Sequence, residues 1–307
     1  MQTKSISHNI RSKMDEWIAT INDTELRNDL TKNILVSGGC VASMFLNESV
    51  NDYDVYIQDR NVLLSLVKYY TKPFGSLKVF DGKFKDDLID EYRGEFSISE
   101  FLKHNASEAS ALRTLRDDQI KIFIPHSSGG YKVGQKEGVE LNKYIPVFFS
   151  PNAISLTDNI QIVIRFWGSP DEIHKTFDFV HPTNYFTYAK GIVLNQNALE
   201  SLLTKQLKYQ GSFYPVTSII RSKKFIKRGW NINAGELMKI MFQISKLNLD
   251  DMDVLEEQLI GVDVAYFGAL IEALRDHKER NPDFELTTDY FNTLIDRIFN
   301  NFEGEDQ

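Results

Sequence analysis

ILVSGGCVASMFLNESVNDYDVYI, residues Ile34–Ile57, is the stretch that decides the fold. Its first three residues are apolar, and the chain then breaks at Ser-Gly-Gly. Cys40–Leu46 has apolar residues at helical spacing, and a second strand follows over Tyr53–Ile57. The pattern predicts a strand, a glycine turn, a short helix and a second strand.

Two carboxylates at the second strand indicate a cation site. Asp52 and Asp54 are two residues apart, so both side chains leave the same face, while Val55 and Ile57 point to the other face and a core. Two neighbouring carboxylates repel each other unless a cation lies between them. Oxygen ligands of this kind suit Mg²⁺ or Mn²⁺. We therefore expect Asp52 and Asp54 to be catalytic metal ligands.

The glycine turn is a candidate phosphate site. It leads into a helix N-terminus, where free backbone N–H groups attract phosphate. Gly38 and Gly39 let the backbone approach a phosphate because they carry no Cβ. Ser37 and Ser43 are expected either to add hydroxyl donors or only to cap and pack. Cys40 is expected to be a small packing residue. A nucleoside triphosphate is the substrate that these features favour.

The pattern Gly38-Gly39-Cys40-Val41, followed by Asp52-Tyr53-Asp54, resembles the head motif of the polymerase-β-like nucleotidyltransferase superfamily. It is particularly similar to class II CCA-adding enzymes and bacterial poly(A) polymerases. Those enzymes usually carry Arg-Asp where this chain has Ala42-Ser43, and their Glu-Asp-x-x-Arg motif is not found downstream. The layout of the whole chain also resembles nucleotidyltransferase-like proteins of large bacteriophages.

The resemblance implies an α+β fold with a nucleotidyltransferase-type mixed sheet and flanking helices. It also implies two metal ions about 3.5–4 Å apart and a third carboxylate on a neighbouring strand. Asp178, in the alternating segment Phe177–Val180, is our candidate for that carboxylate and for the group that accepts the proton. The alternative is a surface acid on an edge strand. By the same analogy, Lys190 is a candidate triphosphate contact.

The length of 307 residues allows one large domain or two ordinary ones. We predict a nucleotidyltransferase catalytic domain over residues 1–182 and a helical domain over residues 183–307. In the first domain, strands are predicted at residues 77–80, 119–125, 131–133, 144–149, 161–166 and 177–180. Residues 131–133 are expected to be the hairpin partner of residues 119–125. Predicted helices lie at residues 6–30, 60–70, 169–176, 185–209 (as one or two), 219–230, 233–247, 254–259, 262–280 and 288–302. Residues 83–116 are expected to be an insertion.

Charge is distributed unevenly along the chain. The net charge is −8, but residues 250–307 hold sixteen Asp and Glu against four Arg and Lys. This acidic region is a candidate surface for a protein partner. Cys40 is the only cysteine, which fits a reducing cytoplasm, and no apolar run reaches the length of a membrane helix. We expect a cytoplasmic protein without membrane contact, in the host cytoplasm if it is encoded by a phage.

A basic segment precedes the acidic region. Residues 201–235 contain seven Lys and Arg and no acid, interleaved with Tyr209, Phe213, Tyr214, Phe225 and Trp230. Basic groups neutralise phosphates, and aromatic faces stack bases. RNA is therefore an expected partner, with tRNA as one candidate, and Arg221 and Lys223 are candidate contacts to the triphosphate or to RNA. A solvated helix face is the alternative.

Three hypotheses follow. The first is a Mg²⁺-dependent nucleotidyltransferase that transfers NMP from an NTP to an acceptor hydroxyl, favouring an RNA 3′ end. The second transfers NMP to a protein or a small molecule. The third is a nucleotidyltransferase fold that binds nucleotide or partner without catalysis, an option left open by Ala42-Ser43.

Overall fold

The computed structural model describes residues 2–84, 118–124, 130–133, 143–249, 251–258 and 287–300, with seven further residues between 270 and 281. The chain divides into two compact units. The first comprises residues 1–174 and 181–202, and the second comprises residues 175–180 and 203–307. Residues 183–202, which we assigned to the helical domain, thus belong to the first unit.

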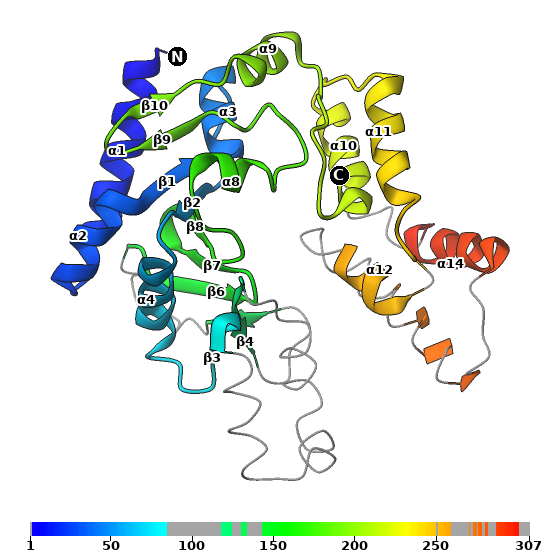
Figure 1. The fold of residues 1–307 in the computed structure, drawn as a ribbon, viewed down its shortest axis with the longest axis horizontal. Helices are drawn as coiled ribbons and strands as arrows, with labels where there is room; N and C mark the ends of the chain where they lie inside the picture. The colour runs from blue at the N-terminus through cyan, green and yellow to red at the C-terminus, as the bar shows by residue number, and fades with distance from the viewer. Residues whose placement is uncertain are drawn as a thin grey trace. The chain divides into compact units, whose positions relative to one another are not determined.

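The first unit is built on an eight-stranded mixed sheet (Figure 1). Its strand order is β10-β9-β1-β2-β8-β7-β6-β5, and only the β2–β8 pair is parallel. The strands are β1 Ile34–Ser37, β2 Tyr53–Ile57, β5 Tyr131–Lys132, β6 Pro146–Ser150, β7 Ala153–Leu156, β8 Ile160–Val163, β9 Tyr185–Thr187 and β10 Gly191–Val193.

The predicted strand, turn, helix and strand of residues 34–57 are confirmed. The helix α3 spans Gly39–Leu46 and ends at Asn47, whose φ of 57° lies in the left-handed region that closes many helices. β1 pairs antiparallel with β2, with Val36 opposite Val55. All four residues of β1 are buried, because β2 and β9 flank the strand within the sheet.

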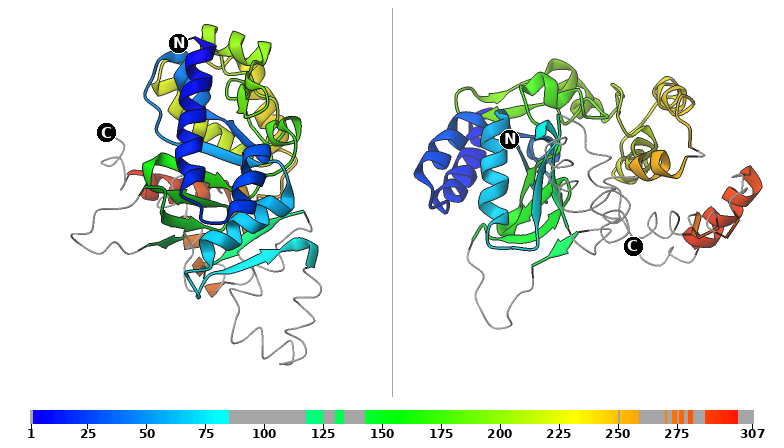
Figure 2. Two further views of the ribbon diagram at one scale, coloured as in Figure 1. Left: turned by 90° about the vertical axis from the view of Figure 1, so that its left-hand side faces the viewer. Right: turned by 60° about the horizontal axis from the view of Figure 1, so that its bottom comes forward.

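Three helices cover one face of this sheet: α1 Thr3–Ala19, α2 Thr24–Asn33 and α4 Arg60–Thr71 (Figure 2). The apolar residues of α1, spaced three or four apart, are buried: Ile6, Ile10, Met14, Trp17 and Ile18. The single predicted helix over residues 6–30 is wrong, because the Asp23 carboxylate accepts the N–H of Leu26 and starts a second helix. Trp17 donates its indole N–H to the Tyr70 hydroxyl at 2.8 Å and joins α1 to α4 within the core.

The predicted helix over residues 185–209 is wrong in its first part. Tyr185–Thr187 forms strand β9 against β1, and β10 returns after a turn at Gly191, whose φ is 66°. Only α9, Gln196–Thr204, is helical. Because this aromatic segment pairs with the edge of β1, its backbone N–H and C=O groups form hydrogen bonds within the sheet. The helical spacing of its apolar residues does not reveal this pairing.

The remaining strands differ in detail from the prediction. β3, Lys78–Asp81, pairs with β4, Ile120–Phe123, in a separate two-stranded sheet, whereas β5 pairs with β6 and is not the hairpin partner of β4. β7 was not predicted. Residues 85–117, most of the predicted helix 262–280 and the last residues lie outside the described residues.

Helices dominate the second unit, as predicted: α10 Pro215–Lys227, α11 Ala234–Ile244, α12 Met252–Gln258 and α14 Thr288–Asn300. Phe179 packs edge-on against Tyr209 and Phe225, and Phe225 packs against Trp230. Each helix within the described residues is too short or too polar to cross a membrane. A mixed sheet with flanking helices, followed by a helical region, confirms the predicted α+β class.

Candidate functional site

The glycine turn and the aspartate strand meet at one end of the sheet of the first unit. Because β1 and β2 are antiparallel, the end of β1 lies beside the start of β2. Gly38 has a φ of +94°, and a Cβ at this position would lie 2.8 Å from Oδ2 of Asp54. Glycine is therefore favoured at residue 38 for two reasons: its backbone conformation and the Asp54 carboxylate beside its Cα.

The two aspartates differ in their surroundings. Asp52 is exposed just before β2, and no hydrogen bond or ion pair of its side chain is found within the described residues. Asp54 is half-buried on β2, while Val55 and Ile57 are fully buried in the core on the other face, as predicted. This pair of oxygen donors fits Mg²⁺ or Mn²⁺. Groups of three or more His, Cys, Asp or Glu able to hold a metal are absent from the part of the chain that the structure describes.

Ser37 does not face solvent. It is fully buried, and its hydroxyl lies 3.1 Å from each of the carbonyls of Pro182 and Asn184 and 2.9 Å from Nε2 of His174. The hydroxyl has one proton, so it donates to a carbonyl and accepts from a protonated Nε2. Ser37 therefore holds the start of the glycine turn against the segments that carry His174, Pro182 and Asn184.

His174 ends the short helix α8, Pro170–His174, which lies within the predicted helix 169–176 and begins at a capping box, where Glu172 accepts the N–H of Ser169 at 2.7 Å. Burial lowers the pKa of His174 to about 4, against a smaller opposing effect of Asp171. The imidazole is thus neutral at pH 7. A neutral ring with its proton on Nε2 is the form that the bond to Ser37 requires.

The start of α3 is partly available to a ligand. The N–H of Gly38 donates to the carbonyl of Pro182 at 3.0 Å, so this donor is taken. Gly39 is exposed, and a Cβ added to it would meet nothing within 4 Å. The first N–H groups of a helix have no partner within it. The candidate phosphate site is therefore limited to Gly39 and the residues directly after it.

Cys40 is the packing residue that we expected. The thiol is buried, which raises its pKa to about 12, and the nearby charge of Asp54 adds to this effect. A thiol of this kind is not a nucleophile at neutral pH. Ser43 is half-buried on the second turn of α3, and its contact with phosphate stays a prediction.

Lys190 is not on a helix. It is exposed in the turn between β9 and β10. Tyr185 pairs with Ser37 and Thr187 with Leu35, so β9 runs away from the glycine turn before it reaches Lys190. The structure places Lys190 beyond the opposite end of β1, which is unfavourable for a triphosphate contact.

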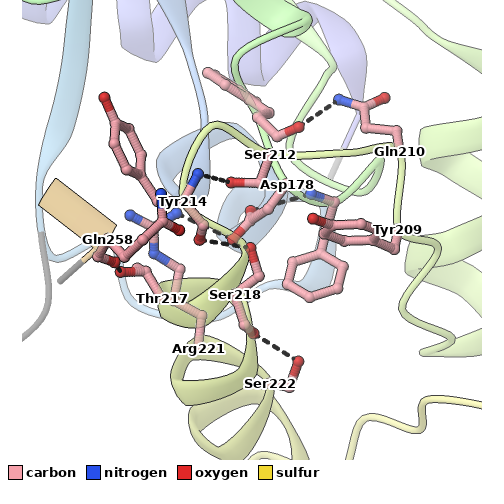
Figure 3. A network of polar contacts seen from close by, with 12 residues as sticks. Asp178, Tyr209, Gln210, Ser212, Tyr214, Thr217, Ser218, Arg221, Ser222 and Gln258 are labelled. Atoms are coloured by element: carbon pink, nitrogen blue, oxygen red, sulfur yellow. Dashed lines mark hydrogen bonds and ion pairs between the residues drawn. The ribbon is translucent and has the colours of Figure 1, made fainter. Parts of the chain in front are cut away.

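Asp178 and Arg221 contact each other within the second unit (Figure 3). Arg221 Nη1 lies 3.0 Å from Oδ2 of the buried Asp178, whose Oδ1 accepts the N–H of Phe179 at 3.0 Å. The predicted strand 177–180 is wrong, since only Phe179 forms an isolated bridge, with Tyr209. Both carboxylate oxygens are thus occupied. Asp52 and Asp54 belong to the first unit, and their convergence with Asp178 stays a prediction.

The basic segment separates into a buried and an exposed part. Tyr209, Tyr214 and Trp230 are buried, so their faces do not serve as stacking platforms, whereas Phe213 is exposed. Burial raises the pKa of Tyr209 to about 12. The basic side chains on the surface are those of Lys223, Lys224, Lys227 and Arg228. The exposed basic side chains are compatible with the predicted contact to phosphates. Most of the aromatic residues of the segment are buried in the core of the second unit and are not exposed for stacking.

Sequence reasoning missed two polar residues that strand pairing brings to the site. Gln161 on β8 is the partner of Asp54, and Ser155 on β7 is the partner of Gln161. Both are half-buried. The alternation of polar and apolar residues in β8 indicates that Gln161 lies on the polar face of this strand. Only the pairing of β2 with β8 identifies Gln161 as the neighbour of Asp54.

The profile of the family described as "Gabija anti-defense 2 family protein" (Gad2) matches residues 8–205. The chain belongs to the Gad2 family. The Gad2 match covers most of the first unit, including the glycine turn and both aspartates. A protein of Bacillus phage SPbetaL7 named "Gabija anti-defense 2" is 22% identical over 151 residues, which are 46% of this chain and 38% of that relative. The chain thus covers well under two thirds of that relative's length.

The solved structures to which this Gad2-family chain is similar include CCA-adding enzymes and a tRNA nucleotidyltransferase. The Thermotoga maritima CCA-adding enzyme complexed with tRNA has a TM-score of 0.39 at 12% identity, covering 89% of this chain and 57% of that one. A tRNA nucleotidyltransferase complexed with a primer tRNA and an ATP analogue has a TM-score of 0.35 at 12% identity, covering 81% and 57%. The expected resemblance to phage proteins is met by the family match and the Bacillus phage relative.

Proposed function

We propose that this Gad2-family chain is a divalent-metal-dependent nucleotidyltransferase that a phage uses against a host defence. It transfers NMP from an NTP to an acceptor hydroxyl and releases pyrophosphate. The observation that supports this proposal most strongly is the contact of the Asp54 carboxylate with Gly38, beside the exposed Asp52 and the open start of α3 at Gly39.

Each group has a distinct part in the proposed reaction. Asp52 and Asp54 hold Mg²⁺ or Mn²⁺, which when bound supplies positive charge at the phosphates and lowers the pKa of the attacking hydroxyl. The N–H groups at the start of α3 hold the phosphates of the NTP. Ser37 and His174 fix the turn so that Gly39 and Asp54 keep their relative position.

The favoured acceptor is an RNA 3′ end, with tRNA as one candidate. The exposed side chains of Lys223, Lys224, Lys227 and Arg228 can neutralise RNA phosphates. Such a protein acts in the cytoplasm of the infected host. Its action on RNA would be one way to counter a defence system.

A protein or small-molecule acceptor is the second candidate. The burial of Tyr209, Tyr214 and Trp230 favours it, because these residues are then unavailable to stack bases. The acidic region at residues 250–307 would be the surface for a protein partner. Binding without catalysis is the third candidate, and the engagement of Asp178 by Arg221 favours it.

One experiment separates the three candidates. Each labelled NTP is incubated with the protein, Mg²⁺ or Mn²⁺, and either total RNA or a host-cell extract. Label on RNA that is lost in Asp52→Asn and Asp54→Asn supports the first candidate, and label on a protein supports the second. Asp29→Asn is the matched control, since the half-buried Asp29 of α2 forms its side-chain ion pair with Lys32 of the same helix. Nucleotide binding without any transfer supports the third, and equal transfer by the wild type and both site variants contradicts the proposed site.

A further inference from the structure

A row of polar side chains crosses three strands beside the candidate site. Asp54 on β2 is in register with Gln161 on β8, and Gln161 is in register with Ser155 on β7. Residues in register on neighbouring strands share a face, about 4.8 Å apart. The alternate residues Ile154, Ile160 and Ile162 are fully buried in the core with the helices, so the row lies on the opposite face.

Gln161 is available to a ligand on this face. It is half-buried, and no hydrogen bond of its side-chain amide is found among the residues that the structure describes. The amide group has both a carbonyl oxygen and an NH₂ group, and a partly buried amide without partners is unfavourable. A cation held by Asp54 would provide a partner for the amide oxygen, because carbonyl oxygens are suitable ligands for Mg²⁺ and Mn²⁺.

The identity of this residue decides the charge of the site. A third carboxylate in register with Asp54 would give the site a charge of −3 and favour two divalent cations. An amide leaves the charge at −2, which one divalent cation balances. The remaining candidate carboxylate, that of Asp178, lies in the second unit with both oxygens engaged.

We propose that the site takes a single divalent cation, bound by Asp52 and Asp54 with the amide oxygen of Gln161 as a neutral third ligand. This inference rests on the function proposed above. It changes the expected number of metal ions from two to one. It also assigns a metal-binding role to Gln161 on β8.

The test counts Mn²⁺ bound to the purified full-length chain, using the electron paramagnetic resonance signal of free Mn²⁺ during a titration without nucleotide. The wild type is expected to bind one Mn²⁺ at this site. Gln161→Glu adds a charge beside the cation and is expected to raise the affinity about tenfold. Gln161→Leu removes the oxygen ligand and is expected to weaken binding several-fold.

Gln58→Glu is the matched control. Gln58 is four residues from Asp54, just beyond the opposite end of β2, and the same charge is added to the same unit about 13 Å away. It is expected to leave Mn²⁺ affinity within twofold of the wild type. Circular dichroism of each variant shows that the fold is retained.

The outcomes distinguish the inference from the function on which it rests. Two Mn²⁺ ions in the wild type, both lost in Asp54→Asn, overturn the single-cation proposal. If Gln161→Glu and Gln161→Leu bind Mn²⁺ as Gln58→Glu does while Asp54→Asn does not bind, Gln161 is not a ligand and the proposed function stands. If Asp52→Asn and Asp54→Asn bind Mn²⁺ as the wild type does, both the inference and the proposed site are wrong.

Discussion

At the scale of single residues, Gly38 links the backbone conformation of the turn to the candidate site, because Asp54 lies directly against it. The positive φ of Gly38 and the carboxylate of Asp54 beside its Cα disfavour a side chain. Gly39, the next residue, has an ordinary φ and open space around it. The two glycines of the motif therefore have different roles: the first allows the approach of Asp54, and the second keeps the start of α3 open.

Gly38→Ala is expected to destabilise the protein by about 2 kcal/mol, because alanine is strained at this φ and ψ and its Cβ displaces the carboxylate. Mn²⁺ affinity should fall with it. Urea unfolding followed by circular dichroism measures the first effect. Gly39→Ala is the matched control and should change stability by less than about 0.5 kcal/mol. Equal losses in both variants would mean that the backbone conformation of Gly38 is not what matters.

His174 predicts how stability depends on pH. Its pKa falls from the ordinary 6.5 to about 4 on folding, so the unfolded chain binds more protons between these values. The contribution of His174 is fully present above pH 6.5 and is lost as the pH falls toward 4, by an amount on the order of 2 kcal/mol.

The comparison variant is His174→Gln, whose amide N–H can still donate to Ser37. Urea unfolding at several pH values between 7 and 4 should show a smaller loss in the variant than in the wild type. Parallel curves for the two proteins would assign the pH dependence to other groups.

At the scale of elements, the ion pair of Asp178 and Arg221 fastens residues 175–180 to helix α10 (Figure 3). The segment also accepts the N–H of Gln210 at the Asp178 carbonyl, at 2.9 Å. An acid in an alternating Phe-Asp-Phe setting can thus be held by a helix of its own unit and need not belong to a sheet. This explains why the strand predicted at 177–180 is wrong.

Arg221→Met is expected to destabilise the second unit by about 2 kcal/mol, because it leaves the buried carboxylate of Asp178 without its counter-ion. The estimate lies below the usual cost for a fully buried pair since the Arg221 side chain is 41% exposed. Thermal unfolding measures this loss, and Asp178→Asn combined with Arg221→Met should restore part of it.

Mn²⁺ binding distinguishes the structural role of Asp178 from the catalytic one predicted from the sequence. If Asp178 only pairs with Arg221, Asp178→Asn leaves Mn²⁺ affinity unchanged. A loss as large as that of Asp54→Asn would show that Asp178 is a metal ligand after all.

At the scale of the whole molecule, the second unit exposes basic side chains and buries most of its aromatic residues, so the proposed RNA contact would depend on charge rather than on stacking. Lys224→Glu with Lys227→Glu is expected to weaken RNA binding and to lower the slope of log affinity against log salt by about 2, because about one phosphate contact is lost for each lysine. Fluorescence anisotropy of labelled RNA at several salt concentrations measures both effects. Lys4→Glu with Lys72→Glu, two exposed lysines of the first unit, is the control pair. An unchanged slope in the first double variant would remove RNA as the partner of this surface.

The sequence by itself determined the strand, turn, helix and strand of residues 34–57, the opposite facing of Asp54 and Val55, the helical character of the N-terminal region and the α+β class. These depend on glycine conformation and on the periods of two and 3.6 residues, which are local properties. Only the tertiary structure decided that Tyr185–Thr187 is a strand, that Ser37 is buried beneath His174, that Asp178 pairs with Arg221 and that Gln161 adjoins Asp54. Each of these joins residues far apart in the chain, and a contact between distant residues is set by which strand edges and counter-ions become neighbours on folding.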